Sequence, residues 1–243
     1  MSPRTSDQGR STRASSATTS VEDYAKTIYG LSEWDGAAVT ASDLARALGV
    51  SNPSVSTMVR KMAELGLVEH QPYAPVELTE EGRRLALAMV RRHRLIETWL
   101  VRELGYGWDE VHQEAERLEH AVTDLFIERL DVRLGYPRVD PHGDPIPSPE
   151  LVTYYPETVL LCRVGSGGRV RLEQVDDGVP QALQLLQAQR LALGSSVEVR
   201  DAGGRDPAGG DAAGREVIVV GPHGDLRLPH DVAHAVRVCV LDG

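Results

Sequence analysis

The sequence predicts an α+β protein, and three observations lead to that prediction. Apolar residues recur at helical spacing through residues 21–134. Residues 135–149 then contain five prolines. Beyond them, apolar and polar residues alternate in short runs between Gly and Pro turns, as in β-strands. We therefore expect a helical N-terminal half, a connecting segment and a small β domain.

Composition and charge narrow the class of protein. The chain has 243 residues, of which 41% are hydrophobic, so it can form a core. No apolar run reaches membrane-spanning length or resembles a signal peptide, so we expect a cytoplasmic protein without membrane contact. The net charge of −10 argues against indiscriminate coating of nucleic acid. Residues 40–94 carry eight Lys/Arg against six Asp/Glu (+2), whereas residues 95–135 carry four against ten (−6).

The first residues are expected to form a tail and a short helix. Residues 1–20 are rich in Ser and Thr with little to bury, so we expect a disordered tail. Ser20 is expected to cap the helix that follows, because an acid stands three residues later. Tyr24, Ile28 and Leu31 supply its apolar stripe at i, i+4 and i+7.

The helix-capping and turn residues from residue 39 onward predict a helix-turn-helix. A capping box from Thr40 to Asp43 opens one helix, and Gly49 follows where a turn needs positive φ. Residues 51–53 open the second helix, with Pro in its first turn. This helix is expected to bury Val55, Met58, Val59 and Met62. A hairpin over residues 67–78 completes a winged helix-turn-helix, which we assign to residues 21–82.

The exposed face of the second helix carries hydroxyl and basic groups. These are the groups that contact phosphates and base edges in DNA. The candidate DNA contacts are Ser51, Pro53, Ser54, Ser56, Thr57, Arg60 and Lys61. Three-helix units with similar capping and turn residues also serve as interaction modules. The pattern alone therefore leaves open whether this unit binds DNA or serves as an interaction module.

Two helical segments further on carry metal-ligand residues at helical spacing. The segment VHQEAERLEH, residues 111–120, places two His and two Glu on one face, and RRHRLIE, residues 91–97, places one of each at i, i+4. Buried carboxylates need a partner or a cation. The candidate ligands are His93, Glu97, His112, Glu116, Glu119 and His120. A solvated acidic face remains the alternative.

Residues 83–134 are expected to form a helical domain that packs against a second copy. One helix is predicted from about residue 80 toward 104, and a second opens at Asp109. The apolar side of the second helix comprises Val111, Ala115, Leu118, Val122, Leu125 and Leu130.

Residues 135–150 are interpreted as an extended proline-rich linker, and residues 151–243 as a small SH3-like β-barrel. Six strands are expected at residues 159–164, 170–175, 197–200, 217–220, 225–228 and 236–240, with a brief helix near 181–189.

The Gly- and Asp-rich segment 202–214 should be mobile. Structural or exposed roles are expected for His142, His223, His230 and His234, and core positions for Cys162 and Cys239.

Several of these motifs together resemble one family closely. EDYAKTIY (22–29), SNPSVSTMVRKMAELGLV (51–68), RRHRLIE, VHQEAERLEH and DPHGDPIP (140–147) are similar to the diphtheria toxin repressor family of metal-dependent transcriptional repressors, and most of all to its manganese transport regulator branch. The resemblance covers about residues 21–147 closely. It continues more loosely through LPHDVAHAVRV (228–238) in the SH3-like part.

The resemblance implies two neighbouring metal positions. The primary site would use Asp23, Glu116, Glu119 and His120, although Asp23 is also the acid expected to stabilise a helix start. The second would use His93, Glu97 and His112, completed by Asp177 or Gln174. Lys26 stands where some manganese members place a ligating carboxylate, which argues against their close two-manganese cluster.

The resemblance also implies a function. We expect a manganese-activated repressor of metal-uptake genes that binds a double-stranded DNA operator as a homodimer, with no enzymatic activity and no small-molecule substrate. In the family's iron-responsive members a Met stands at the position of Asp23 and a Cys at that of Glu116, so an iron-dependent repressor is the alternative. Fe²⁺, Zn²⁺, Co²⁺ and Cd²⁺ are expected to bind in vitro.

Two other functions deserve comparison. A metallohydrolase is disfavoured because HExxH and HxxEH are absent. A metal-storage protein would not need hydroxyl and basic groups on an exposed helix face.

Overall fold

The computed structural model describes residues 18–34, 36–69, 71, 74–108, 110–202, 216–221 and 224–241. The chain divides into two compact units, Met1–Ala86 and Leu87–Gly243. Nearly all of the tail expected to be disordered, and of the insert expected to be mobile, lies outside the described residues. Asp109, expected to open a helix, and His223 lie outside them too.

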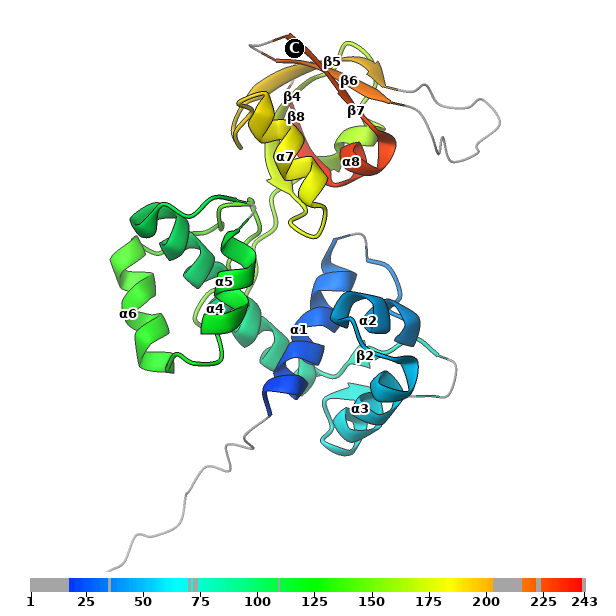
Figure 1. The fold of residues 1–243 in the computed structure, drawn as a ribbon, viewed down its shortest axis with the longest axis vertical. Helices are drawn as coiled ribbons and strands as arrows, with labels where there is room; N and C mark the ends of the chain where they lie inside the picture. The colour runs from blue at the N-terminus through cyan, green and yellow to red at the C-terminus, as the bar shows by residue number, and fades with distance from the viewer. Residues whose placement is uncertain are drawn as a thin grey trace, which may run out of the picture. The chain divides into compact units, whose positions relative to one another are not determined.

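The first unit contains three helices followed by a hairpin (Figure 1). The helices are α1 (Thr19–Glu33), α2 (Ala41–Leu48) and α3 (Asn52–Glu64). Strands β1 (Val68–Glu69) and β2 (Glu77–Leu78) pair antiparallel. This is the predicted order of elements, and it places α3 as the second helix of a helix-turn-helix.

Local side-chain chemistry explains where these helices begin and end. Thr40 and Asp43 form the predicted capping box of α2, and Gly49 ends it at φ 65°. The Ser51 hydroxyl caps α3 by accepting from the Ser54 amide. Gly82 is required because a Cβ there would lie 1.9 Å from the Leu67 carbonyl oxygen.

The predicted start of α1 is wrong by two residues. Helix α1 begins at Thr19, and Ser20 lies inside its first turn rather than at its cap. The carbonyl oxygen of Thr18 already accepts from the amides of Val21 and Glu22, at 2.7 and 3.1 Å, so the first turn forms without a side-chain cap.

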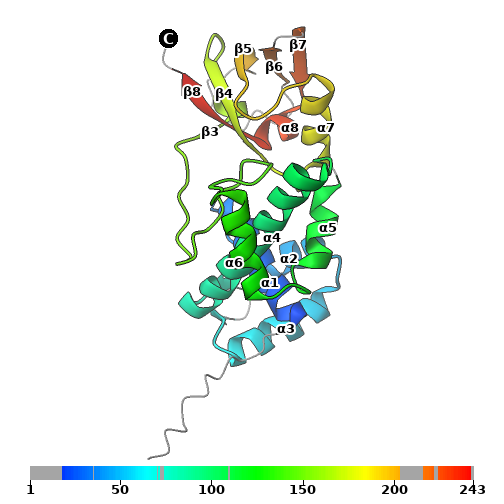
Figure 2. The same ribbon diagram turned by 90° about the vertical axis from the view of Figure 1, so that its left-hand side faces the viewer.

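Helix α4 (Glu80–Leu104) is the long helix that the sequence predicts, and the boundary between the units falls within it. The Thr79 hydroxyl caps it by accepting from the Gly82 amide at 3.1 Å. In the second unit, α4 shares a core with α5 (Val111–Leu118) and α6 (Asp124–Leu134), as Figure 2 shows. That core includes Leu95, Ile96 and Leu100.

The prediction of one continuous helix after residue 109 is wrong. The chain turns between α5 and α6, where the Thr123 hydroxyl accepts from the Phe126 amide and caps α6. The Arg92 guanidinium donates to the carbonyl oxygens of Glu119 and Val122, which satisfies backbone groups that a continued helix would have used. Leu125, expected on the apolar side, is therefore exposed.

The middle of the segment interpreted as a linker, residues 140–147, is packed rather than extended, whereas its two ends are exposed. Val139 and Pro145 form an isolated antiparallel bridge. Two buried arginines of α4 hold the segment through its carbonyl oxygens: Arg91 donates to Pro147 at 2.7 Å and Arg94 to Pro145 at 2.8 Å. The prolines have no amide hydrogen to donate, but their carbonyl groups accept, and each guanidinium group makes one of its hydrogen bonds in this way.

The C-terminal part contains one six-stranded antiparallel sheet in the order β3-β8-β4-β5-β6-β7. The strands are β3 (Val159–Leu160), β4 (Arg169–Val175), β5 (Ser196–Ala202), β6 (Val217–Gly221), β7 (Gly224–Leu228) and β8 (Val236–Leu241). The expected barrel is not confirmed, because β3 and β7 remain unpaired edges among the described strands. The first expected strand is cut short by a 3-10 turn at Leu161–Arg163.

Two helices share the apolar core of this sheet (Figure 1). Helix α7 (Pro180–Ala188) matches the expected brief helix, whereas α8 (His230–His234) has no counterpart in the sequence prediction. Leu183 and Leu186 of α7 and Val232 of α8 are fully buried there. In the described part of the chain, no helix is both long and apolar enough to cross a bilayer.

The buried pair Arg91–Asp131 gives a stability prediction. The guanidinium lies 2.6 Å from the carboxylate, and both side chains are buried. Arg91→Ala should destabilise the protein by about 3–5 kcal/mol, because Asp131 is left as an unpaired buried charge. Urea unfolding measures this loss against Arg102→Ala, which removes an exposed arginine of the same helix. The pair of changes Arg91→Met and Asp131→Leu should recover most of the loss. Equal midpoints for Arg91→Ala and Arg102→Ala would contradict the assignment.

Candidate functional site

Residues from α4, from α5 and from the turn after it surround the carboxylate of Glu97 in the second unit. His93 and Glu97 stand one turn apart on α4, and both are buried. The His93 Nε2 atom lies 3.0 Å from Glu97 Oε1, and its Nδ1 atom lies 2.6 Å from Glu119 Oε2. One imidazole therefore bridges two buried carboxylates, which is the kind of pairing that buried charges require.

His112, on α5, reaches the same carboxylate. Its Nδ1 atom lies 3.3 Å from Glu97 Oε1, 3.1 Å from His93 Nε2 and 2.9 Å from Oδ2 of Asp177, which stands in the turn after β4. One ligand atom of each of these four residues lies within 4.8 Å of the others. The structure thus brings together the four residues that the sequence predicts for the second metal position.

Electrostatics keep the carboxylates of this cluster ionised. Burial acts to raise the pKa of Glu97, but the charge of His93 and hydrogen bonds from both histidines outweigh it and hold the pKa well below its usual range. The pKa of Asp177 is lowered by His112 in the same way, against burial. Burial acts to lower the pKa of His112, yet its hydrogen bonds to Asp177 and Glu97 raise it to about 11.

Three buried atoms beside this network have no hydrogen-bond partner. They are Glu97 Oε2, Asp140 Oδ2 and His142 Nδ1, three of the four such side-chain atoms among the described residues. His142 Nε2 lies 3.2 Å from the Trp108 carbonyl oxygen, which can only accept, so Nε2 is the donor; Nδ1, 3.9 Å from Glu97 Oε2, is the ring nitrogen left to ligate a metal. Two carboxyl oxygens and an imidazole nitrogen are all possible metal ligands, and such ligand atoms gathered within 4.8 Å of one another fit a divalent cation.

The loop that carries Asp140 and His142 is fixed on both sides. The Asp140 Oδ1 atom accepts from the amides of His142 and Asp144, at 2.8 and 2.9 Å. The His142 carbonyl oxygen accepts from the Val175 amide of β4 at 2.9 Å. Gly143 has φ +87°, and a Cβ there would lie 2.0 Å from a carbonyl oxygen of β4. Burial, followed by the charges of Asp144 and Glu97, raises the pKa of Asp140 well above its usual value.

The sequence prediction did not include Asp140 and His142 among the ligands. His142 was expected to be structural or exposed, and it is fully buried. The available signal was the alternation Asp140-x-His142-x-Asp144, which places three metal-binding side chains in five residues. Interpreting the prolines around it as a linker concealed that signal.

Three of the residues predicted for the primary position, Glu116, Glu119 and His120, lie close together in the second unit. The Glu119 carboxylate is fully buried, and the His120 Nε2 atom lies 3.4 Å from its Oε1 atom. Glu116 is half-exposed, 3.9 Å from His93 Nδ1, and His93, Glu116 and Glu119 form a further group of closely spaced ligand atoms. Asp23 stands on α1 in the first unit, and its part in the site belongs to the proposal below.

The seven predicted DNA contacts all lie on the exposed surface at or beside α3. Several of their hydroxyl groups are already hydrogen-bonded within the helix. Ser56 Oγ donates to the Asn52 carbonyl oxygen and Thr57 Oγ1 to that of Pro53, each at 3.0 Å. Both oxygen atoms still accept, so this face offers hydroxyl acceptors together with the cationic groups of Arg60 and Lys61.

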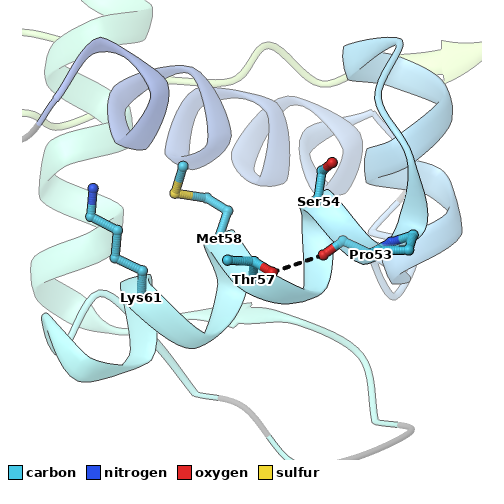
Figure 3. Close-up of a pocket in the computed structure, with 5 residues that line it drawn as sticks. All are labelled: Pro53, Ser54, Thr57, Met58 and Lys61. Atoms are coloured by element: carbon cyan, nitrogen blue, oxygen red, sulfur yellow. Dashed lines mark hydrogen bonds between the residues drawn. The ribbon is translucent and has the colours of Figure 1, made fainter.

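Met58, expected to be buried, is only half-buried. Figure 3 shows it in an open hollow on α3 that Pro53, Thr57 and Lys61 also line. Asn52, which the sequence prediction left out, is exposed at the first position of α3, where recognition helices contact bases. Its amide can pair with adenine in the major groove.

Comparison with known proteins identifies two domains. Residues 16–76 match the family domain described as iron dependent repressor, N-terminal DNA binding domain. Residues 79–148 match the domain described as iron dependent repressor, metal binding and dimerisation domain.

Whole-chain relatives agree with these matches. The iron-dependent repressor IdeR of Mycobacterium tuberculosis is 35% identical over 224 residues, covering 89% of this chain and 95% of the relative. The diphtheria toxin repressor of Corynebacterium diphtheriae is 32% identical over 229 residues, covering 89% and 95%. Among solved structures, a manganese-dependent transcriptional repressor in complex with manganese is similar, with TM-score 0.81, 41% identity and coverage of 91% and 100%.

The repressor ScaR with bound Zn²⁺ is also similar, with TM-score 0.76, 31% identity and coverage of 91% and 99%. These relatives are transcriptional repressors and not enzymes, which removes the metallohydrolase alternative. This chain belongs to the diphtheria toxin repressor family of metal-dependent, DNA-binding transcriptional repressors.

Proposed function

We propose that this family member is a manganese-activated repressor that binds an operator as a homodimer in the cytoplasm and controls metal-uptake genes. The observation that carries the metal assignment is the donor set. The described clusters contain only carboxylate and imidazole groups, and neither Cys162 nor Cys239 belongs to one. Oxygen and imidazole donors suit hard Mn²⁺, whereas thiolate and thioether donors favour softer ions.

Two positions for the cation follow from the two buried carboxylates. One is centred on Glu97 and draws on His93, His112, Asp177, Asp140 and His142. The other is centred on Glu119 and draws on Glu116, His120 and, from the first unit, Asp23. A divalent cation supplies the positive charge that these acceptors lack, and the chain supplies a site already buried and oriented.

The link to DNA binding is mechanical. Asp23 as a ligand would tie α1 to the helical part of the chain, residues 83–134, through which two copies pair. Residues 21–82 of each copy would then present α3 to DNA at a fixed separation. Successive major grooves are about 34–36 Å apart, so a dimer needs that separation to be held. The C-terminal part, residues 151–243, is proposed to be an SH3-like module that supplies Asp177.

Metal identity is tested by titrating operator binding with each ion, anaerobically for Fe²⁺. Mn²⁺ should activate near its own binding constant, and Zn²⁺ should activate less well because it prefers four ligands. Asp23→Met combined with Glu116→Cys should shift activation toward Fe²⁺. A response of the unmodified protein to Fe²⁺ but not to Mn²⁺ would establish the iron-dependent alternative instead.

Glu97 should be essential for metal binding. Its carboxylate is proposed both to pair with the two histidines and to ligate the metal. Glu97→Gln should weaken Mn²⁺ binding by at least about tenfold, since even outer partners of a metal ligand contribute that much. Isothermal titration measures the change. Glu103→Gln, the same substitution at an ion-paired position further along α4, is the matched control. Equal affinities for the two variants would exclude Glu97 as a ligand.

Metal affinity should rise with pH. His112, with its pKa of about 11, is protonated at neutral pH and must lose that proton to ligate. Glu97 and Asp177, with lowered pKa values, are already ionised there and release none. Mn²⁺ affinity should therefore increase by at least about tenfold per pH unit between about pH 6 and pH 8, because His112 loses a proton on ligation and Asp140, whose pKa is raised, loses one wherever it is still protonated. Proton release, counted by titration in buffers of different ionisation enthalpy, should fall by one in His112→Gln. An unchanged count would contradict ligation by His112.

Arg60 should contact DNA from the exposed face of α3. Arg60→Ala should weaken operator binding by about 1–3 kcal/mol if the guanidinium reads a base. If it contacts a phosphate, the slope of affinity against salt should fall by about one. Fluorescence anisotropy at several salt concentrations separates the two results, with Arg102→Ala as control. Unchanged affinity and slope, with metal content intact, would remove Arg60 from the interface.

A further inference from the structure

The end of helix α5 is held by an arginine of α4. The Arg92 guanidinium donates through Nη1 to the carbonyl oxygens of Glu119 and Val122, at 3.2 and 2.8 Å. Its Nη2 atom donates to the carboxylate of Asp124, the first residue of α6. The last carbonyl groups of a helix have no partner within the helix, so a cation with several donors is well suited to this place. Arg92 therefore fixes the backbone on which α5 ends.

Helix α4 holds the same glutamate a second time, through its carboxylate. The Glu119 side chain is fully buried, and its Oε2 atom lies 2.6 Å from Nδ1 of His93, the residue directly after Arg92. Consecutive helical residues point about 100° apart, so one side chain of α4 reaches the backbone of Glu119 and the next reaches its carboxylate. His120 follows directly, with Nε2 3.4 Å from Glu119 Oε1, and its position depends on the same stretch of backbone.

Glu119 and His120 are two of the ligands of the proposed metal position centred on Glu119. We propose that Arg92 is a positioning residue for this position. Without touching the cation, it holds the end of α5 so that both ligand side chains are oriented before the cation binds. This inference rests on the proposed function of Glu119 as a metal ligand. Ligands ordered in advance lose little conformational freedom on binding, and the groups that hold a ligand typically contribute about 10–100-fold in metal affinity.

The contacts to the carbonyl groups carry this role, rather than the ion pair with Asp124. The Asp124 side chain is 88% exposed, whereas that of Arg92 is 20% exposed. An ion pair whose carboxylate is open to solvent is screened and contributes little. Hydrogen bonds from a charged donor to a carbonyl oxygen contribute more than neutral ones. Removing the charge of Asp124 should therefore leave the end of α5 in place, whereas removing the guanidinium should release it.

The test assigns each class of Mn²⁺ site on the full-length protein. Electron paramagnetic resonance follows free Mn²⁺ during a titration. The class of site lost in Glu97→Gln belongs to one position, and the class lost in Glu119→Gln belongs to the other. Arg92→Gln should weaken the Glu119 class by about tenfold and leave the Glu97 class unchanged. Arg92→Lys keeps the charge without the planar fork, so it should recover only part of the loss. Asp124→Asn is the matched control and should bind at both positions as the unmodified protein does.

A second measurement needs no metal. The amides of Ala121 and Val122 donate to the Leu118 carbonyl oxygen, at 2.9 and 3.2 Å, and so form the turn after α5. Without added metal, these two amides should exchange with solvent faster in Arg92→Gln than in Asp124→Asn, because the end of α5 is no longer held. The amides of α4 should keep their rates in both variants.

The pattern across the two classes decides the outcome. Equal weakening of both classes in Arg92→Gln would make Arg92 a general stabiliser of the fold and overturn the inference, and so would unchanged affinity in the Glu119 class. If Arg92→Gln does not fold, Arg92→Lys compared with Asp124→Asn decides by the same two criteria. If the unmodified protein has no class of site that Glu119→Gln removes, the proposed metal position itself is contradicted, and this inference with it.

Discussion

The burial of the Glu97 carboxylate is the constraint on which the rest of the second unit depends. A carboxylate that is 1% exposed cannot stay ionised without compensating charge or hydrogen bonds. His93 and His112 provide both to its Oε1 atom. Its Oε2 atom receives no hydrogen bond and lies 3.9 Å from His142 Nδ1, which has no hydrogen-bond partner either. The protein thus keeps an excess of acceptors in a buried place, which is the arrangement that a cation completes.

The same constraint explains why separate elements converge. The Glu97 cluster takes side chains from α4, from α5, from the loop that carries Asp140 and from the turn after β4. The β-bulge between Leu172 and Gln174 turns Gln174 inward, where its amide donates to Asp144. Arg94 adds a guanidinium 3.7 Å from Asp140 Oδ2. The position of this loop and the docking of β4 are therefore properties of one network, which the proposed cation would join.

Local chemistry made much of the first unit predictable. The capping box at Thr40, the positive φ of Gly49 and the proline at the start of α3 each depend on a few neighbouring residues, and each is confirmed. The groups His93–Glu97 and His112–Glu116 were also predictable, because helical spacing alone puts them on one face. Their meeting with Asp177 was an expectation from family resemblance.

The errors arise where distant partners decide the structure. The break after α5 depends on Arg92, whose guanidinium takes the carbonyl groups that a longer helix would have used. The packing of residues 140–147 depends on Arg91 and Arg94 in the same way. Asp140 was missed because the prolines around it were interpreted as a linker, although the spacing of Asp140, His142 and Asp144 was visible in the sequence. The exposure of Met58 likewise follows from tertiary packing that helical periodicity does not contain.

The central claim is that a manganese ion completes the buried acceptors around Glu97. Anomalous diffraction from crystals grown with Mn²⁺, recorded on both sides of the manganese absorption edge, tests it most directly. A manganese peak within bonding distance of Glu97 Oε2, Asp140 Oδ2 and His142 Nδ1 is the predicted result. Manganese peaks elsewhere, with these three atoms bonded only to water or to protein, would contradict the account.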